Sequence, residues 1–246
     1  MKKTAWTLGA LMLLPASTAF ALGPVDLELE VVGWQSSISG ETRSGGLTID
    51  LKKDLGLDDK SVVFLRGRAH ITFLGNLYVG ITPLKYDASS TLSRAITYEG
   101  KTFSASTPVT TNVDLKTYDL GWTFSPLNIG IFEAEIGANI KFIDGTVTVK
   151  SATPTQTAQA DFSAPVPMLK AVLRASGPFV SAEVDGMAIA YADNHLYDVT
   201  AQVKLNPFPF MYVAGGYRFI DLELTDGDKL ASMKNKGPFL GIGVDF

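Results

Sequence analysis

The 246-residue sequence contains no cysteine and only two histidines, His70 and His195. Without thiols the chain cannot form disulfides, thiolate metal sites or a lipidated N-terminal cysteine. Two histidines far apart in the sequence make a poor ligand set, and the acidic stretch 51–60 lacks the spacing of an EF-hand. We therefore expect neither a metal nor a cofactor.

Long apolar runs are scarce as well. The most pronounced one, residues 5–16, is about a dozen residues long, whereas a helix that spans a membrane needs ~20. It follows Lys2 and Lys3 and precedes the small residues of Ala19-Phe20-Ala21. This order predicts a cleaved signal peptide at residues 1–21, which leaves residues 22–246 as a single mature domain.

The mature chain also lacks an excess of positive charge. Once Lys2 and Lys3 are removed, 19 basic residues stand against 25 acidic ones, a net charge of −6. Such a chain has no electrostatic footprint for phosphates, so we expect no nucleic-acid partner.

What the sequence does contain is strict alternation of apolar and polar residues. In residues 132–142 and 63–73, apolar side chains occupy every second position over eleven residues. Strands of soluble proteins average five or six residues, while a tilted membrane strand needs roughly 9 to 11. The length favours strands that cross a membrane, with a soluble periplasmic β-protein as an alternative.

The alternation and the turn signals together predict an all-β fold, a closed antiparallel transmembrane β-barrel of about ten strands, with eight or twelve as alternatives. Short turns on one side and longer polar stretches on the other are typical of bacterial outer-membrane barrels. The expected strands are 27–38, 61–73, 77–87, 111–124, 129–143, 162–175, 179–191, 197–205, 210–224 and 237–246.

Some stretches fit this pattern poorly. Prolines interrupt two strands, at Pro83 and at Pro165 and Pro167. In strand 210–224 the apolar residues change faces after Phe219, which predicts a bulge or an exit from the membrane. The polar stretch 150–160 predicts a mobile outer loop with little local structure.

Aromatic residues lie near the expected strand ends and predict two girdles at the membrane interfaces, one of which includes Trp34, Tyr86 and Tyr118. The last strand alternates up to a terminal aromatic residue. This ending predicts a signal for the barrel-assembly machinery, formed by Leu240, Ile242, Val244 and Phe246.

Charged residues of both signs occupy the faces that would point into the barrel, where we expect them to interlock. A filled or narrow lumen is favoured over an aqueous pore, because barrels of this size leave little room inside. The candidates for this charge network are Glu28, Glu30, Arg66, Arg68, Asp119, Glu133, Glu135, Lys141, Lys170, Arg174, Glu183, Asp185, Lys204 and Arg218.

Several segments, in a shared order, resemble a family of small, largely uncharacterised proteobacterial outer-membrane β-barrel proteins. They are IDLKKDLGLDD (49–59), LGNLYVGITPLKYD (74–87), LKTYDLGW (115–122), KFIDGTV (141–147), HLYDVTAQVKLNP (195–207), GGYRFIDLEL (215–224) and GPFLGIGVDF (237–246). The resemblance implies the barrel and the outer membrane of a Gram-negative bacterium. It implies no reaction or ligand.

An enzymatic alternative depends on His195, which Asp193 and Asp198 flank in an expected outer loop. This arrangement is similar to that of the omptin outer-membrane proteases, which also need a second acidic pair on a facing loop. Loop 89–110 offers only Glu99 for that role. His70 is expected to be a hydrogen-bonded member of the charged interior.

The sequence therefore predicts a non-enzymatic outer-membrane barrel with a structural, binding or small-solute passage role. Its expected surroundings are outer-membrane lipid and lipopolysaccharide, with the assembly machinery as a partner during biogenesis. The alternative function is that of an outer-rim hydrolase built on His195 and Asp193. A small-molecule ligand is not identified by any residue pattern.

Overall fold

A computed structural model describes residues 25–44, 47–227 and 229–246, so the expected signal peptide lies outside the described residues. No helix in these three ranges is long and apolar enough to cross a membrane. The strands are β1 (Val25–Ser44), β2 (Leu47–Asp50), β3 (Lys60–Ile71), β4 (Gly75–Thr91), β5 (Ile96–Tyr98), β6 (Lys101–Phe103), β7 (Pro108–Ile129), β8 (Phe132–Ala152), β9 (Thr155–Ser176), β10 (Val180–Tyr191), β11 (Asn194–Phe208), β12 (Met211–Asp226) and β13 (Lys229–Asp245).

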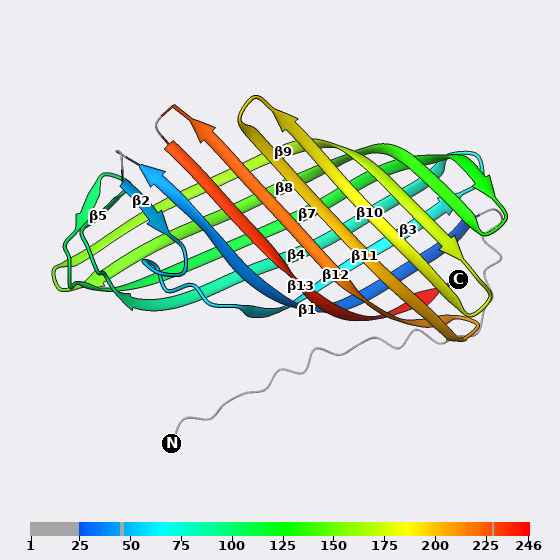
Figure 1. The fold of residues 1–246 in the computed structure, drawn as a ribbon, viewed down its shortest axis with the longest axis horizontal. Coiled ribbons are helices and arrows are strands. Elements are labelled where there is room, and N and C mark those ends of the chain that lie inside the picture. Colours follow the sequence, from blue (N-terminus) through cyan, green and yellow to red (C-terminus); the bar gives the residue numbers. More distant parts are fainter. Residues whose placement is uncertain (1–24, 45–46, 228) are drawn as a thin grey trace, which may run out of the picture.

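Ten of these strands form one closed antiparallel barrel (Figure 1). The last strand, β13, pairs with the first, β1, in a register that runs from Glu28 opposite Asp245 to Arg43 opposite Leu230. Beyond the last strand, the backbone groups of Phe246 and Leu27 exchange hydrogen bonds of 2.9 and 3.0 Å. Closure satisfies the backbone groups that hydrocarbon would leave unpaired. The predicted ten-stranded barrel is confirmed, and the eight- and twelve-stranded alternatives are wrong.

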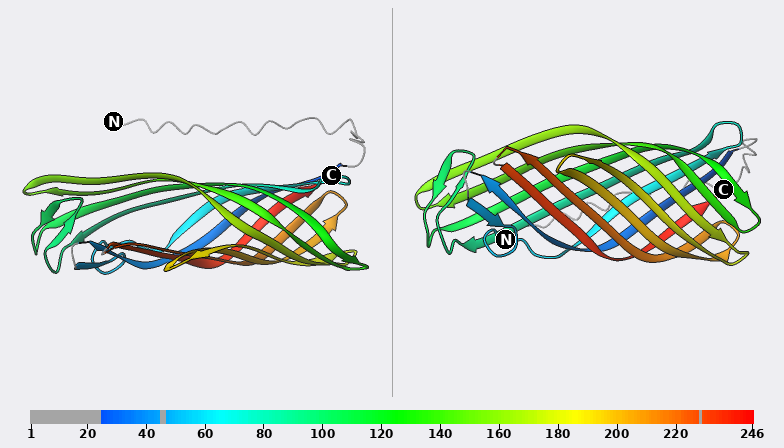
Figure 2. Two further views of the ribbon diagram at one scale, coloured as in Figure 1. Left: turned by 90° about the horizontal axis from the view of Figure 1, so that it is seen from above. Right: turned by 45° about the horizontal axis from the view of Figure 1, so that its top comes forward.

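The two ends of the barrel differ, as Figure 2 shows. Short turns connect β3 to β4, β7 to β8, β9 to β10 and β11 to β12 at one end, which is the periplasmic end in bacterial barrels. The other end, the outer end, carries the longer segments 47–59 and 92–107. Strands β7, β8 and β9, with 22, 21 and 22 residues, rise on one side of it.

The expected mobile loop at 150–160 is wrong, because these residues form the tip of the β8–β9 hairpin. The two strands stay in register from Phe132 opposite Ala175 to Ala152 opposite Thr155. Threonine and valine alternate along β8 up to residue 149, and β-branched residues favour strands. The alternation therefore continues beyond the membrane as a tall wall on one side of the barrel.

The bulge expected in β12 after Phe219 is wrong as well. Strand β12 keeps one register with β13 from Met211 opposite Val244 to Asp226 opposite Lys229. Ile220 and Leu222 stay on the lumen face, next in line after Arg218. The lumen face itself changes from charged to apolar, and this change gave the appearance of a shift in register.

The outer face of the barrel carries an apolar belt, in which Leu169 and Leu240 are each 73% exposed. Tyr118 and Trp122 lie on this face, 42% and 43% exposed. Trp34 and Tyr86, which were expected in a girdle, point into the lumen and are 1% and 2% exposed. Alternation places these two side chains with the lumen-facing residues of β1 and β4.

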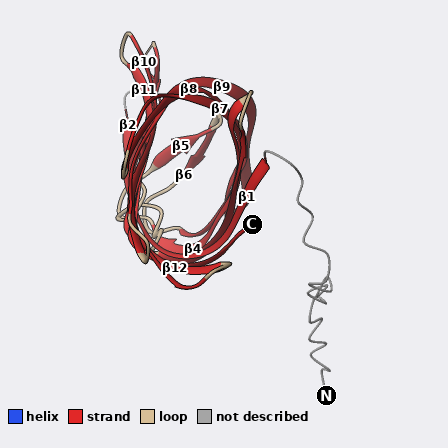
Figure 3. Cartoon of the chain, turned by 90° about the vertical axis from the view of Figure 1, so that its right-hand side faces the viewer, coloured by secondary structure: helices blue, strands red, loops and turns tan. Residues whose placement is uncertain are grey.

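The outer segments fold back over the mouth of the barrel. Strand β2 pairs with the end of β1, and β5 and β6 form a separate hairpin. Figure 3 shows this hairpin inside the outline of the barrel wall. We call residues 51–59 together with β5 and β6 the lid.

Candidate functional site

The periplasmic half of the lumen is filled by charged side chains, which we call the charged layer. All fourteen residues predicted for the charge network lie on the lumen face, and each one contacts a residue of opposite charge. The charged layer consists of Glu28, Glu30, Arg66, Arg68, Asp119, Glu133, Glu135, Lys141, Lys170, Arg174, Glu183, Asp185, Asp198, Lys204 and Arg218.

Arg174 on β9 is the most connected member of the charged layer near the short turns. Its guanidinium nitrogens lie 2.7 Å from Glu133, 3.0 Å from Glu135 and 2.9 Å from Glu183. These carboxylates come from the two neighbouring strands, β8 and β10. The planar guanidinium donates in several directions at once and so can hold all three carboxylates.

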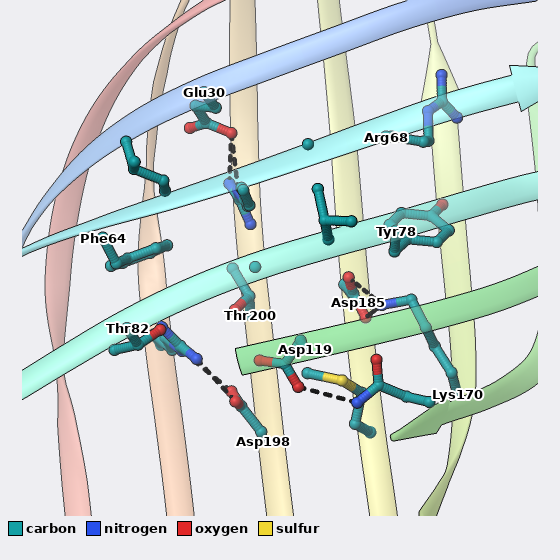
Figure 4. A pocket seen from close by; sticks show the side chains of 18 of the residues that line it. Glu30, Phe64, Arg68, Tyr78, Thr82, Asp119, Lys170, Asp185, Asp198 and Thr200 are labelled. Carbon is teal, nitrogen blue, oxygen red and sulfur yellow. Dashed lines mark hydrogen bonds and ion pairs between the residues drawn. The ribbon is translucent and has the colours of Figure 1, made fainter. Parts of the chain in front are cut away.

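A second cluster lies deeper in the barrel. Arg218 donates hydrogen bonds of 3.0 and 2.7 Å to Asp198 and one of 2.9 Å to Thr82 (Figure 4). Lys141 donates to Asp198 at 3.0 Å and to Asp119 at 2.7 Å. Because these contacts join β4, β7, β8, β11 and β12, the cluster ties opposite walls together.

The contacts of the charged layer leave little free space. The cavity within it measures about 70 Å³ and is lined by Glu30, Arg66, Asp119, Asp185 and other members of the layer (Figure 4). That volume holds no more than a few water molecules. The charged layer therefore closes the lumen toward the periplasm.

Aromatic rings separate the charged layer from the outer half of the lumen. The ring of Phe64 lies 6.2 Å from the rings of both Trp34 and Phe239, edge to face in each case. The Arg218 guanidinium lies 4.6 Å from the Phe64 ring and 5.3 Å from the Trp34 ring. We call Trp34, Phe64 and Phe239 the aromatic divider. Such cation–π contacts join it to the charged layer.

Above the divider, the outer half of the lumen contains a cavity of about 630 Å³, which we call the apolar chamber. Polar groups at the chamber come mainly from the outermost parts of the strands and from Glu99 in the turn between β5 and β6. Its apolar lining comes from six barrel strands, β2 and the lid: Ile38, Ile49, Leu51, Leu55, Leu57, Tyr98, Val113, Leu115, Val147, Ala160, Phe162, Leu222, Leu224, Leu230, Ala231 and Met233.

Polar contacts fix the lid above the apolar chamber. Arg94 contacts Asp54 at 2.9 Å, and Ser90 donates to the backbone carbonyl of Asp54 at 2.9 Å. Burial raises the pKa of the Asp54 carboxyl, but the hydrogen bond from the Asp50 backbone and the nearby Arg94 outweigh it and hold the pKa below the usual range. Gln156 of β9 donates to the carbonyl of Thr102, which attaches the hairpin to the tall wall.

Tyr98 places a phenol at the chamber wall. Burial, together with the charges of Glu99 and Asp161, raises its pKa to about 12. The side chain is therefore neutral at physiological pH. It adds no charge to the apolar lining.

Of the two acids that flank His195 in the sequence, the structure turns Asp198 to the opposite face of β11. His195 lies on the outer face, stacked on Tyr197 at 4.9 Å, and its Nε2 lies 3.6 Å from Asp221. Asp193 is exposed in the β10–β11 turn, and Asp198 belongs to the charged layer with 1% exposure. His70 faces the lumen and shares a 2.8 Å hydrogen bond with Asn76. No cluster of three metal-binding side chains occurs in the described ranges.

Sequence reasoning missed two members of the interior. Asp198 was assigned to the His195 loop, although it shares a face with Thr200, Gln202 and Lys204. The alternation of the expected strand 197–205 would have placed Asp198 on the lumen face with them. Tyr212 is the second: its side chain faces the lumen, and its hydroxyl donates to Glu28 at 2.7 Å.

No family model and no curated protein matches the sequence. Among solved structures, the outer membrane protease OmpT from Escherichia coli is similar, with 9% identity, a TM-score of 0.49, and coverage of 90% of this chain and 96% of that one. The attachment invasion locus protein of Yersinia pestis shares 11% identity, with a TM-score of 0.40 and coverage of 90% and 99%.

Neisserial surface protein A has 11% identity and a TM-score of 0.38, with coverage of 91% of this chain and 98% of that one. These neighbours are outer-membrane β-barrels from proteobacteria. At such identities the likeness concerns the fold alone. The fold assignment rests on the strand pairing of this chain, a closed antiparallel barrel of ten strands.

Proposed function

We propose that the protein is a non-enzymatic outer-membrane barrel that binds an alkyl chain in the apolar chamber and conducts no ions. The observation that carries the proposal is the 630 Å³ apolar cavity above a lumen that the charged layer closes. Small-molecule sites measure roughly 300 to 1,000 Å³ and are mostly apolar. The chamber has this size and this lining.

The lining also indicates the chemistry of the ligand. The chamber walls are mainly aliphatic side chains, including Ile38, Leu115 and Val147. A ligand with many polar groups would leave them without partners there, which costs free energy. A flexible hydrocarbon chain can follow an irregular aliphatic wall and needs no polar partner except at its head.

Binding is tested with the purified barrel in detergent and cis-parinaric acid, a fluorescent fatty acid. We expect saturable binding to the wild type and at least about tenfold weaker binding to Leu222→Lys, because a charge would enter the apolar chamber. Glu223→Lys places the same side chain on the opposite, outer face of the same strand and should bind like the wild type. Heat-dependent gel mobility verifies that each variant is folded.

Two outcomes contradict the proposal: no saturable binding to the wild type, or equal affinities for Leu222→Lys and Glu223→Lys. The first means that the chamber binds no alkyl chain. The second means that the probe binds elsewhere, for example to the apolar belt.

The non-enzymatic part of the proposal is supported by Asp198, which flanks His195 in the sequence but is held by Arg218 in the charged layer and not beside His195. We expect membranes that carry wild type or His195→Ala to show equal protease, lipase and lipid A processing activity. An activity that disappears in His195→Ala would favour the hydrolase instead.

A further inference from the structure

The barrel wall contains two seams at which neighbouring strands stop pairing before they end. Strand β3 pairs with β4 only from Ile71 opposite Gly75 to Leu65 opposite Ile81, while β4 continues to residue 91. Strand β10 pairs with β9 only from Ser181 opposite Ser176 to Ala188 opposite Leu169. The remaining part of β9, residues 155–168, pairs with β8 alone.

Proline occurs just beyond the last pair at both seams. Pro83 lies two residues past Ile81 in β4, and Pro167 lies two residues from Leu169 in β9, with Pro165 following. Proline has no N–H to donate and is therefore confined to strand edges. The prolines end the pairing and also remove donors that an open edge would leave unsatisfied.

The first seam is covered by the lid. Residues 51–59 lie along the outer part of β4, where Ser90 donates to the carbonyl of Asp54 at 2.9 Å. Lys60 of β3 reaches Asp87 of β4 at 3.4 Å. These contacts cross from the β3 side to the β4 side, so this seam is bridged.

The second seam is bare. Within the described part of the chain, no hydrogen bond or ion pair joins residues 155–168 to β10 or β11, and Figure 3 shows the tips of β10 and β11 outside the barrel outline. Ala160 and Phe162 line the apolar chamber on one side of this seam, and Asn194 lines it on the other. Phe162 is 44% exposed although it faces the lumen.

The bare seam lies at the outer edge of the apolar belt. Below it, Leu169 and Leu173 are 73% and 60% exposed on the outer face of β9, and Phe142 of β8 lies opposite Pro165. Asp161 and Ser163, farther along β9, make the outer face polar. The seam therefore begins in the hydrocarbon region and ends at the level of the lipid head groups.

Taken with the proposed function, on which this step depends, we infer that the apolar chamber exchanges its ligand laterally with the outer leaflet through the β9–β10 seam. The ligand is a single-chain amphiphile, whose chain enters the chamber while its head stays at the polar rim. The charged layer closes the route to the periplasm, and the lid covers the route to the medium. The seam joins the chamber to lipid.

The test compares two serines on the outer face, each beside one seam. Ser163→Cys lies beside the bare β9–β10 seam and Ser89→Cys beside the covered β3–β4 seam. Because the chain contains no cysteine, a bulky thiosulfonate-polyethylene glycol can be attached to either site after folding. Neither side chain faces the chamber, so the label should leave the equilibrium affinity for cis-parinaric acid unchanged.

We expect the label on Ser163→Cys to slow both association and dissociation of cis-parinaric acid in vesicles by about tenfold, equivalent to ~1.4 kcal/mol of barrier. Removing the label with a reductant should restore both rates. The label on Ser89→Cys should change neither rate. This pattern supports entry through the bare seam.

Saturable binding with unchanged rates in labelled Ser163→Cys would overturn lateral entry and leave the proposed function intact. Faster exchange in Arg94→Ala, which releases the lid contact with Asp54, together with unchanged rates in labelled Ser163→Cys, would assign the route to the lid. Absence of saturable binding in all forms would contradict the proposed function itself.

Discussion

In the periplasmic half of the lumen, Arg174 alone contacts three carboxylates, whereas in the outer half Leu115, Leu222 and their neighbours surround a cavity of about 630 Å³. Strands β1, β7, β8, β9 and β12 contribute side chains to both halves. On β12, for example, Arg218 is followed on the lumen face by Ile220 and Leu222. On these five strands the lumen face changes from charged to apolar along the strand.

The difference shows how one barrel can combine closure with binding. Charged side chains of opposite sign find partners across a narrow lumen, and their contacts leave only about 70 Å³ free. Apolar side chains make no directional contacts with partners across the lumen. In the outer half they therefore line the chamber without closing it. The aromatic divider of Trp34, Phe64 and Phe239 marks the boundary.

The largest effect is expected from breaking the charged layer. Arg174→Ala leaves Glu133, Glu135 and Glu183 without their common partner and should lower the free energy of unfolding by about 3 to 5 kcal/mol. Urea unfolding followed by heat-dependent gel mobility measures the loss. Arg43→Ala, which removes a half-exposed guanidinium 3.8 Å from Glu41, should cost at most about 1 kcal/mol. Equal losses would mean that the charged layer does not stabilise the barrel.

A smaller effect is expected when a larger side chain is introduced. Comparing such a substitution in the charged layer with one in the apolar chamber distinguishes the two halves directly. A side chain at Gly121 would meet the Asn139 side-chain oxygen at 2.9 Å in the charged layer, so Gly121→Leu should lower the free energy of unfolding by about 1 to 3 kcal/mol. Ala160→Leu adds volume to the wall of the apolar chamber and should change the free energy of unfolding by less than about 0.5 kcal/mol. Similar losses in urea unfolding for both variants would contradict an open chamber above a packed layer.

The smallest effect is expected at the lid. Because the pKa of Asp54 is lowered in the folded protein, its contribution is present above the unfolded pKa near ~3.9 and is lost as the pH falls through the folded value. Hydrogen-exchange protection factors in residues 92–107, which correct for the intrinsic rate at each pH, should therefore be high at pH 7 and fall once the pH drops below the lowered pKa of Asp54. Asp54→Asn should already show low protection at pH 7. Identical protection factors in wild type and variant at pH 7 would remove Asp54 as the residue that holds the lid.

Much of this architecture could be predicted from the sequence, because the period of two is a direct consequence of strand geometry. The ten strands, their closure and the lumen-facing charges such as Arg66 and Glu135 all follow from it. The extension of β8 and β9 through residues 150–160 was not predicted, although alternation continues toward it. The polar composition of these residues indicated a loop where the two strands form the tall wall.

The apolar chamber could not be predicted, because alternation distinguishes two faces only when they differ in polarity. On β12, Phe219 faces outward and Ile220 inward, and both are apolar, so the pattern suggested a bulge that is absent. Trp34 and Tyr86 were misplaced for the same reason, since an aromatic residue suits both a membrane interface and an apolar lumen. The chamber is formed by side chains from several strands together, so the pattern of a single strand does not reveal it.

The most direct measurement of the central claim, that the charged layer closes the lumen below the chamber, is the conductance of the purified protein in planar bilayers. The contacts of Arg174, Lys141 and Arg218 cross the lumen, and the cavity within the charged layer measures only about 70 Å³, so we predict no stable conductance steps for the wild type. Reproducible steps from wild-type protein, with no added ligand, would contradict a closed charged layer and favour a water-filled pore.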